Sequence, residues 1–244
     1  MRVGRLPAAV LLLRAASGRA ASPLSAAAGT AEVFAIARWI YELQPPPQLV
    51  VFATGGGVQL SSFLLATPGA SRSVLEVQLP YSRESLVELL DGTEPTKYCA
   101  PEVARALAAS AFRRAQALRE RALGSPPAPC VGLGCTAALR SVPMRRGQHR
   151  CFVAVHTETG TFEVSLTLAK GARSRVLEDD VVSRVALLAI AHACGVSPSA
   201  DETAFWRLAS DEEGPSSDQQ AAAATRIEAE ALVHRFTAHD QQDP

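Results

Sequence analysis

Lysine is nearly missing from this chain of 244 residues, where it occurs only at positions 97 and 170, and arginine carries the positive charge. The 24 basic residues are matched by 24 acidic ones, so no basic excess favours a nucleic-acid partner. The longest uncharged apolar run, Leu6 to Leu13, is far shorter than the roughly 20 residues that a membrane-spanning helix needs. With 48% hydrophobic residues, the composition predicts a soluble globular protein that has no membrane span and binds no nucleic acid.

The five cysteines are odd in number and nowhere show a CxxC spacing. Disulfide frameworks and zinc sites both need paired or closely spaced thiols, so the sequence predicts neither. We expect no metal and no cofactor. Cys130, Cys135 and Cys151 fall in predicted strands, where thiols usually act as small buried hydrophobes.

The first 30 residues differ in composition from the rest, with four arginines, several serines and no acid before Glu32. An arginine-rich, serine-rich segment without acids is typical of an organelle transit peptide. We therefore expect residues 1–30 to be a leader and the protein to be mitochondrial, with plastid or cytoplasm as alternatives. A secretory signal is the rival interpretation, but Arg14 and Arg19 directly behind its apolar core count against it. A GC-rich genome would also produce an Arg/Ala bias.

Hydrophobic periodicity and proline or glycine breakers divide the rest of the chain into alternating helices and strands. Helices are predicted at 31–43, 58–66, 83–90, 101–122 and 175–194, and strands at 49–53, 74–79, 130–135, 150–157 and 161–168. The last two strands are joined by a short loop and predict an antiparallel hairpin. Alternation plus this hairpin predicts an α/β fold, with three α/β/α layers around a mixed parallel/antiparallel sheet. That domain spans 31–195, and 196–244 is predicted to be an acidic, polar tail with a weak amphipathic helix near 222–236.

Three glycines, Gly55 to Gly57, follow the first strand and precede a helix. Glycines let the backbone approach a ligand, and the next helix directs unpaired N–H groups at that spot. Ligands of α/β sheets bind beyond the carboxyl ends of strands, where Thr54 and Thr136 also fall. The pattern predicts an anion or nucleotide pocket, with a plain strand-to-helix turn as the alternative.

Four short blocks resemble the motifs of one known family in the same order. They are Ala-Thr-Gly-Gly-Gly at 53–57, Thr-Pro-Gly-Ala-Ser at 67–71, Tyr-Ser-Arg-Glu-Ser-Leu at 81–86 and Val-Gly-Leu-Gly-Cys-Thr at 131–136. The chain thereby resembles the CinA C-terminal domain family, the nicotinamide-nucleotide amidases, over roughly 31–195. The Gly-Gln-His-Arg run at 147–150 is similar to a eukaryotic, divergent branch of that family. The resemblance implies the family's fold and a homo-oligomer.

The family's chemistry is not carried over with its motifs. The resemblance implies a serine nucleophile helped by a tyrosine and a lysine. Here the serine position falls on Phe52 or Ala53, the lysine position falls on Leu86, and only Tyr81 is kept. A hydroxyl attacks an amide only when a neighbouring group takes its proton. Amidase activity is therefore expected to be lost or much reduced.

The first expectation is accordingly a divergent domain that binds a nucleotide-like small molecule, a pyridine nucleotide by resemblance. Its predicted ligand-binding residues are Gly55, Gly56, Gly57, Thr136, His149 and Arg150. One alternative is an active nicotinamide-nucleotide amidase with a relocated nucleophile, whose catalytic residues would be Thr54 and Tyr81. The other is a structural subunit of an organellar assembly, with its pocket filled by side chains. Arginines 72, 83, 145, 146 and 150 are candidates for a phosphate clamp, because arginine presents paired donors.

Overall fold

The computed structural model describes residues 9–11, 23–122, 127–196 and 231–238 of the chain. Its strands are β1 (Ala9–Leu11), β2 (Gln48–Thr54), β3 (Val74–Gln78), β4 (Cys130–Ala138), β5 (His149–His156), β6 (Gly160–Leu168) and β7 (Ala231–Ala238). Its helices are α1 (Pro23–Glu42), α2 (Gln59–Leu65), the 3-10 turn η1 (Ala70–Arg72), α3 (Arg83–Leu89), α4 (Pro101–Arg121) and α5 (Arg175–Ala193). All the described strands belong to one sheet, in the order β1-β7-β6-β5-β4-β2-β3.

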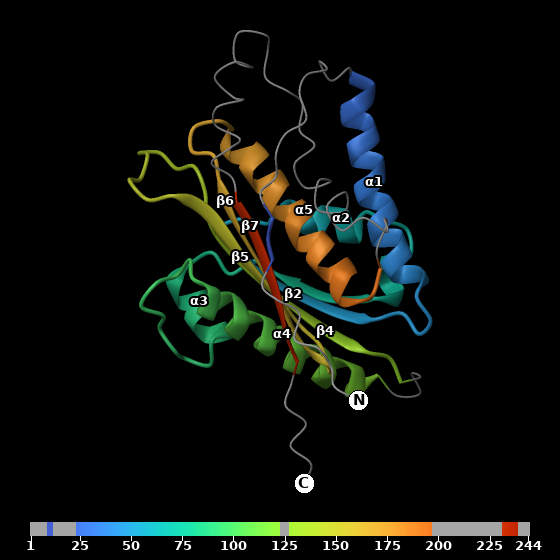
Figure 1. Cartoon of the computed structure of the whole chain (residues 1–244). Helices are drawn as coiled ribbons and strands as arrows, with labels where there is room; N and C mark the ends of the chain where they lie inside the picture. The colour runs from blue at the N-terminus through green and yellow to red at the C-terminus, as the bar shows by residue number, and fades with distance from the viewer. Residues whose placement is uncertain (1–8, 12–22, 123–126, 197–230, 239–244) are drawn as a thin grey trace.

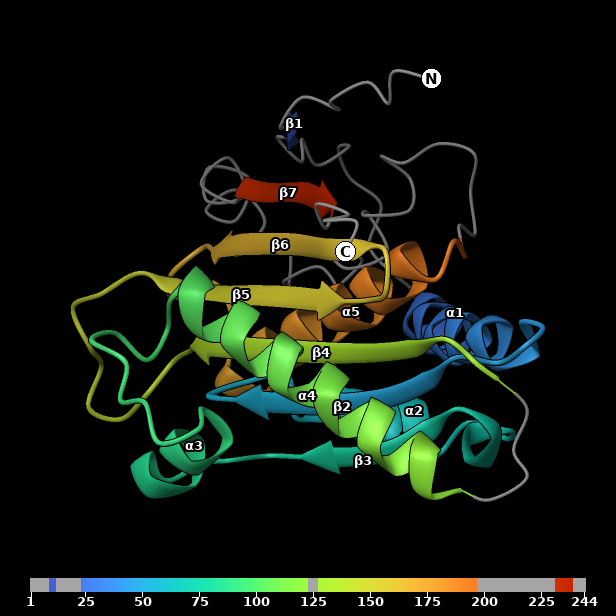
Figure 2. The same cartoon turned by 90° about the horizontal axis from the view of Figure 1, so that it is seen from below.

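Helices cover both faces of this sheet (Figure 1). Helices α1, α2 and α5 lie on one face, and α3 and α4 lie on the other, where α4 crosses β4 and β5 (Figure 2). Strand β2 runs parallel to β3 and β4, whereas the pairs from β4 through β5 and β6 to β7 are antiparallel. The predicted three-layer α/β/α fold with a mixed sheet is confirmed.

Small residues let α4 pack closely on β4. A Cβ atom at Gly132 would lie 2.2 Å from the backbone nitrogen of Phe112, and one at Gly134 would lie 2.2 Å from the carbonyl oxygen of Ala104. Ala104 and Ala108 are buried at this contact. The alanine-rich middle of α4 therefore packs on the sheet, and the glycines of β4 permit the close approach.

Most predicted elements occur within two or three residues of their expected bounds, and local capping chemistry explains why. The hydroxyl of Ser82 accepts a hydrogen bond from the N–H of Ser85 at 3.2 Å, which starts α3 as predicted. Pro101 stands in the first turn of α4, where its missing N–H costs nothing. The hairpin of β5 and β6 is antiparallel, as predicted.

Three elements differ from the sequence-based expectation. Helix α1 begins at Pro23, so the predicted domain start at residue 31 falls within a helix. Strand β4 continues to Ala138, because Ala137 and Ala138 pair with the first residues of β5. The predicted C-terminal helix is wrong at 231–236, where the backbone pairs with β6 instead, since an open sheet edge offers hydrogen bonds to a β-branched and aromatic run.

Other calls on the termini lie outside the described residues. These are positions 1–8 and 12–22 of the predicted leader and the polar tail over 197–230. Within the described ranges, no helix is long and apolar enough to cross a membrane. In the same ranges, no three His, Cys, Asp or Glu side chains gather where a metal ion could bind.

The predicted burial of three thiols is confirmed, since Cys130, Cys135 and Cys151 are fully buried. Burial raises the pKa of Cys135 well above its usual range and raises the pKa of Cys151 to about 12. Both thiols are therefore neutral packing groups at physiological pH.

Candidate ligand-binding cleft

A cleft of about 650 Å³ opens where β2 and β4 end. One wall is formed by the strand ends with Thr54, Gly55 and Thr136, and another by Tyr81 and the start of α3. The third comes from the segment that leads into β5, with His149, and from the first turn of α5. The volume is in the range of small-molecule sites. Five of the eight predicted site residues thus line one cleft.

The two predicted catalytic hydroxyls do not form a working pair. Thr54 lies opposite Thr136 in the parallel register and is partly buried. Tyr81 is 80% exposed at the mouth of the cleft. In the part of the chain that is described, no hydrogen bond joins the Thr54 hydroxyl to the Tyr81 phenol, and the Thr136 hydroxyl already donates to the carbonyl of Tyr98 at 2.7 Å.

The bend formed by Gly55, Gly56 and Gly57, called the glycine bend below, packs against β4. Gly55 has φ +74°, and a Cβ there would lie 2.0 Å from the carbonyl oxygen of Ala137, so only glycine is accommodated. A Cβ on Gly56 would lie 2.7 Å from a Leu139 methyl group, and Gly57 has φ +82° under the Cys135 thiol. Gly55 lines the cleft, whereas Gly56 and Gly57 do not. Both glycines serve the packing of the bend, and their role as ligand contacts stays a prediction.

The N–H groups that begin α2 are also taken. The Asp179 carboxylate of α5 accepts hydrogen bonds from the backbone N–H of Val58 at 3.2 Å and of Gln59 at 3.1 Å. The Gln59 side chain in turn donates to the carbonyl of Val176 at 3.0 Å. A carboxylate of this chain therefore binds the first N–H groups of α2, where the sequence predicts a bound anion.

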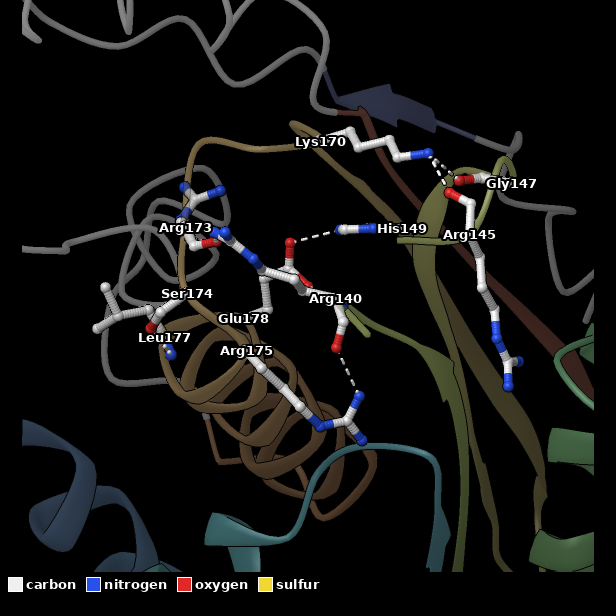
Figure 3. Close-up of polar contacts among 10 residues, drawn as sticks. All are labelled: Arg140, Arg145, Gly147, His149, Lys170, Arg173, Ser174, Arg175, Leu177 and Glu178. Carbon is white, nitrogen blue, oxygen red and sulfur yellow. Dashed lines mark hydrogen bonds and ion pairs between the residues drawn. The ribbon is translucent and has the colours of Figure 1, made fainter. Parts of the chain in front are cut away.

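A buried histidine and a buried carboxylate meet at the α5 side of the cleft (Figure 3). His149 is 4% exposed, and its Nδ1 lies 2.6 Å from Oε1 of Glu178, which is 0% exposed. The other oxygen of Glu178 accepts a hydrogen bond from the backbone N–H of Arg140 at 2.7 Å. The carboxylate thereby fixes the orientation of the imidazole. His149, one of the predicted ligand-binding residues, is thus a buried residue at the edge of the cleft.

His149 and Thr54 approach the cleft from opposite faces of the sheet. Side chains alternate along a strand, so Thr54 shares the α4 face with the buried Phe52, and His149 shares the α5 face with the buried Cys151. His149 is therefore not placed to act as a base for the Thr54 hydroxyl. Arg150 points to the α4 face, where its guanidinium lies 5.5 Å from the Phe152 ring centroid, and it does not line the cleft.

The positions of the missing hydrolytic groups are filled with buried apolar side chains. Phe52, Ala53 and Leu86 are each at most 3% exposed. The cleft also contains Cys99, whose thiol donates weakly to the carbonyl of Arg150 at 3.7 Å. Burial raises the pKa of Cys99, although the Arg150 charge partly opposes the rise. The thiol is therefore not activated as a nucleophile.

The arginines that line the cleft give it a positive charge. Arg83, Arg145 and Arg175 line it, and among the described lining residues there is no Asp or Glu. Arg83 is neutralised by a two-point ion pair with Glu94, in which Nε lies 2.7 Å from one carboxylate oxygen. Arg175 is held by two carbonyl oxygens, those of Arg140 at 2.9 Å and Gly55 at 3.2 Å, and keeps its charge. The cleft is suited to an anionic ligand.

The fold is a three-layer α/β/α domain with a cleft at the carboxyl edge of its parallel strands. No family model matches the sequence, and no curated protein matches it. The chain is similar to the solved structure of competence/damage inducible protein CihA from Agrobacterium tumefaciens, with 16% identity, a TM-score of 0.49, and coverage of 67% of this chain and 96% of that one. It is also similar to a competence or damage-inducible protein from Enterobacter asburiae (13% identity, TM-score 0.47, 68% and 96% coverage). A CinA superfamily protein from Enterobacter cloacae is a third (12% identity, TM-score 0.47, 68% and 90% coverage).

Two functional groups were not identified from the sequence, Glu178 and Asp179. Glu178 lies three and four positions before Val181 and Val182, on the apolar stripe of α5. A carboxylate on a buried stripe needs a partner. The position of Glu178 in the sequence could therefore have indicated that it pairs with another polar group. Nothing in the local sequence indicates that Asp179 caps a helix 120 residues earlier in the chain.

Proposed function

We propose that this protein binds a small anionic, nucleotide-like ligand in the cleft and that it has lost the amidase chemistry of the family that its sequence resembles. The observation that carries the proposal is the cleft itself. It is of ligand size, lies beyond the ends of parallel strands, and is lined by Arg145 and Arg175 without a facing carboxylate.

The loss of amidase chemistry is supported by the lack of a nucleophile with a base. Thr54 is the hydroxyl nearest in sequence to the missing serine, and His149 lies on the opposite face of the sheet. Tyr81 is exposed and not hydrogen-bonded to Thr54 within the described residues. A nucleophile without a positioned base gives up most of its rate enhancement.

A purely structural subunit is the weaker candidate. That function predicts a site filled by side chains, whereas the cleft is open and lined by Gly55, Tyr81 and Thr136.

The test combines binding and hydrolysis on the same preparation. A thermal-shift screen with nicotinamide mononucleotide, AMP and nicotinamide should show stabilisation by the nucleotides, about 2.7 kcal/mol at 100 times the dissociation constant. Hydrolysis of nicotinamide mononucleotide should stay at the level of Thr54→Val, a variant that lacks the hydroxyl of the alternative nucleophile. Hydrolysis well above that level would overturn the loss of activity, and no shift with any nucleotide would overturn the ligand class.

Two sequence-based expectations stand as further proposals. We propose mitochondrial targeting by residues 1–30, tested by fusing them to a fluorescent reporter. Self-association is proposed by resemblance, and sedimentation velocity measures it. A reporter that stays diffuse in the cell would contradict the targeting. A protein that sediments as a monomer at all concentrations would contradict the self-association.

A further inference from the structure

The Nε2 atom of His149 has no hydrogen-bond partner among the described residues, yet it is reached by solvent. The other ring nitrogen, Nδ1, lies 2.6 Å from Oε1 of Glu178, and the side chain is only 5% exposed. In the same part of the chain, the fully buried polar side-chain atoms without a partner are the hydroxyls of Ser73 and Ser183 alone. Nε2 is therefore not sealed in the core, and because His149 lines the cleft, the cleft is where this nitrogen meets water or a ligand.

The surroundings of Glu178 decide which ring nitrogen carries the proton. Its Oε2 accepts a hydrogen bond from the backbone N–H of Arg140 at 2.7 Å, and its Oε1 faces Nδ1 of His149. An ionised carboxylate has only acceptors, so the hydrogen in the contact with the imidazole belongs to Nδ1. A neutral imidazole with its proton on Nδ1 has a lone pair on Nε2. The carboxylate thus orients the ring and makes Nε2 an acceptor toward the cleft.

No arginine among the described residues that line the cleft binds this lone pair. Figure 3 shows the guanidinium groups of Arg145 and Arg175 directed away from the His149 ring. The Arg175 guanidinium instead binds the carbonyls of Arg140 at 2.9 Å and Gly55 at 3.2 Å. Within the described part of the chain, the position in front of Nε2 is consequently left for a donor that comes from outside the protein.

We infer that His149, positioned by Glu178, selects for a hydrogen-bond donor on the ligand, with Nε2 accepting from a ligand hydroxyl or N–H group. The inference rests on the proposed function, in which a nucleotide-like molecule occupies the cleft. The sugar hydroxyls and the amine or amide group of a nucleotide are donors of this kind. A ligand without the donor leaves Nε2 desolvated and unpaired, and sites that contain such a group discriminate against it.

The first test measures the protonation of the ring without any ligand. Long-range proton–nitrogen NMR of the isotope-labelled protein at about pH 8.5, where an ordinary imidazole is neutral, should show a proton on Nδ1 and none on Nε2. The His149 signal is assigned by its absence in His149→Asn. A proton on Nε2, or one on each nitrogen, would overturn the inference.

The variant Glu178→Gln should reverse the two nitrogens with little change of shape. The backbone N–H of Arg140 still needs an acceptor, so the amide oxygen should stay there and the amide NH2 group should face Nδ1. Nδ1 then accepts and Nε2 carries the proton, which the same NMR measurement detects. A bare Nε2 in the folded Glu178→Gln protein would show that Glu178 does not position the ring, and the inference would be wrong.

The matched control is Glu163→Gln, whose carboxylate binds Arg105 at 3.2 Å outside the cleft. This variant makes the same change of carboxylate to amide and should leave the His149 signal as in the native protein. Thermal unfolding of both variants shows whether they are folded. If Glu178→Gln does not fold, the NMR spectrum of the native protein still decides where the proton lies.

The second test takes the nucleotide that binds in the thermal-shift screen, AMP or nicotinamide mononucleotide, and compares it with analogues that each lack one donor. These are the 2′-deoxy form, the 3′-deoxy form and the form without the amine or amide N–H. One analogue should bind the native protein about fivefold more weakly than the parent nucleotide, which corresponds to one hydrogen bond of about 1 kcal/mol. The difference should disappear in Glu178→Gln and persist in Glu163→Gln.

The outcomes separate this inference from the proposed function. If the parent nucleotide and its three analogues bind the native protein equally, the selection by His149 is wrong and the proposed function stands. If Nε2 carries no proton but neither nucleotide binds, the proposed function is wrong and the acceptor in the cleft stands. A donor-dependent affinity that disappears only in Glu178→Gln supports both.

Discussion

The carboxylate of Asp179 accepts a hydrogen bond from the backbone N–H of Gln59 at 3.1 Å and so joins the start of α5 to the start of α2. This contact uses the polar groups that a strand–glycine–helix turn would otherwise present to an anion. It ties the bend to α5, and Gly55 lines the cleft whereas Val58 and Gln59 do not. The same carboxylate also accepts from Val58, so both of its oxygens are engaged.

Replacing Asp179 should therefore destabilise the fold without touching the arginines of the cleft. Asp179→Ala is expected to lower the free energy of unfolding by about 1–2 kcal/mol, the cost of a lost helix cap. Asp179→Asn should cost less, because its amide oxygen still accepts one bond. Urea denaturation at constant m-value measures both, and Glu88→Gln on the exposed side of α3 is the control. Equal stability of all three variants would contradict the role of Asp179.

The close contact of α4 with β4 leads to a second prediction. Gly132→Ala or Gly134→Ala should each cost about 3 kcal/mol or more, because the added methyl group meets helix backbone at 2.2 Å and backbone cannot move aside as a side chain can. Gly147→Ala, with nothing within 4 Å of the new atom, should change stability by less than about 0.5 kcal/mol. Thermal melts report the difference, and a mild effect at both strand positions would show that α4 is not seated on the strand.

The exposed ring of Tyr81 at the mouth of the cleft predicts a contribution to binding alone. Tyr81→Ala should leave unfolding unchanged and weaken nicotinamide mononucleotide binding by about 1 kcal/mol, through lost stacking on the ligand ring. Tyr81→Phe keeps the ring and should bind as the native protein does. Calorimetric titration distinguishes the two, and a loss with Phe equal to that with Ala would assign the effect to the hydroxyl.

The thiols should react slowly. Burial raises the pKa of Cys99 and sets that of Cys151 at about 12, and only the thiolate is nucleophilic. In the folded protein, alkylation of Cys99 should rise only above about pH 8.5, the ordinary cysteine pKa. Cys151 should be labelled only after unfolding in urea. Rapid modification of either at neutral pH, measured by intact mass, would contradict this environment.

The sequence predicted the layers well because they depend on local patterns. The apolar stripe of the helix that begins at Pro101, the Ser82 cap and the alternation along β6 are readable within a few residues and are all observed. The end of β4 and the strand β7 depend on what lies across the sheet. Neighbouring strands, rather than local propensity, decided those elements.

The candidate site was predicted in part for the same reason. Thr54, Gly55 and Tyr81 belong to consecutive motifs and meet in the cleft. The pairing of His149 with Glu178 joins residues 29 positions apart, and the cap by Asp179 spans about 120. Such contacts follow from how α5 lies on the sheet, which the local sequence does not specify.

Strand β4 has β2 on one side and β5 on the other. Within the sheet, strands β2 and β3 reach β5 and β6 through residues 130–138, while β1 pairs with β7 at the far edge. The walls of the cleft come from both sides of β4, with Thr54 and Tyr81 on one side and His149 on the other. A small molecule that binds there therefore bridges segments on both sides of β4 and stabilises the native state in which they are joined.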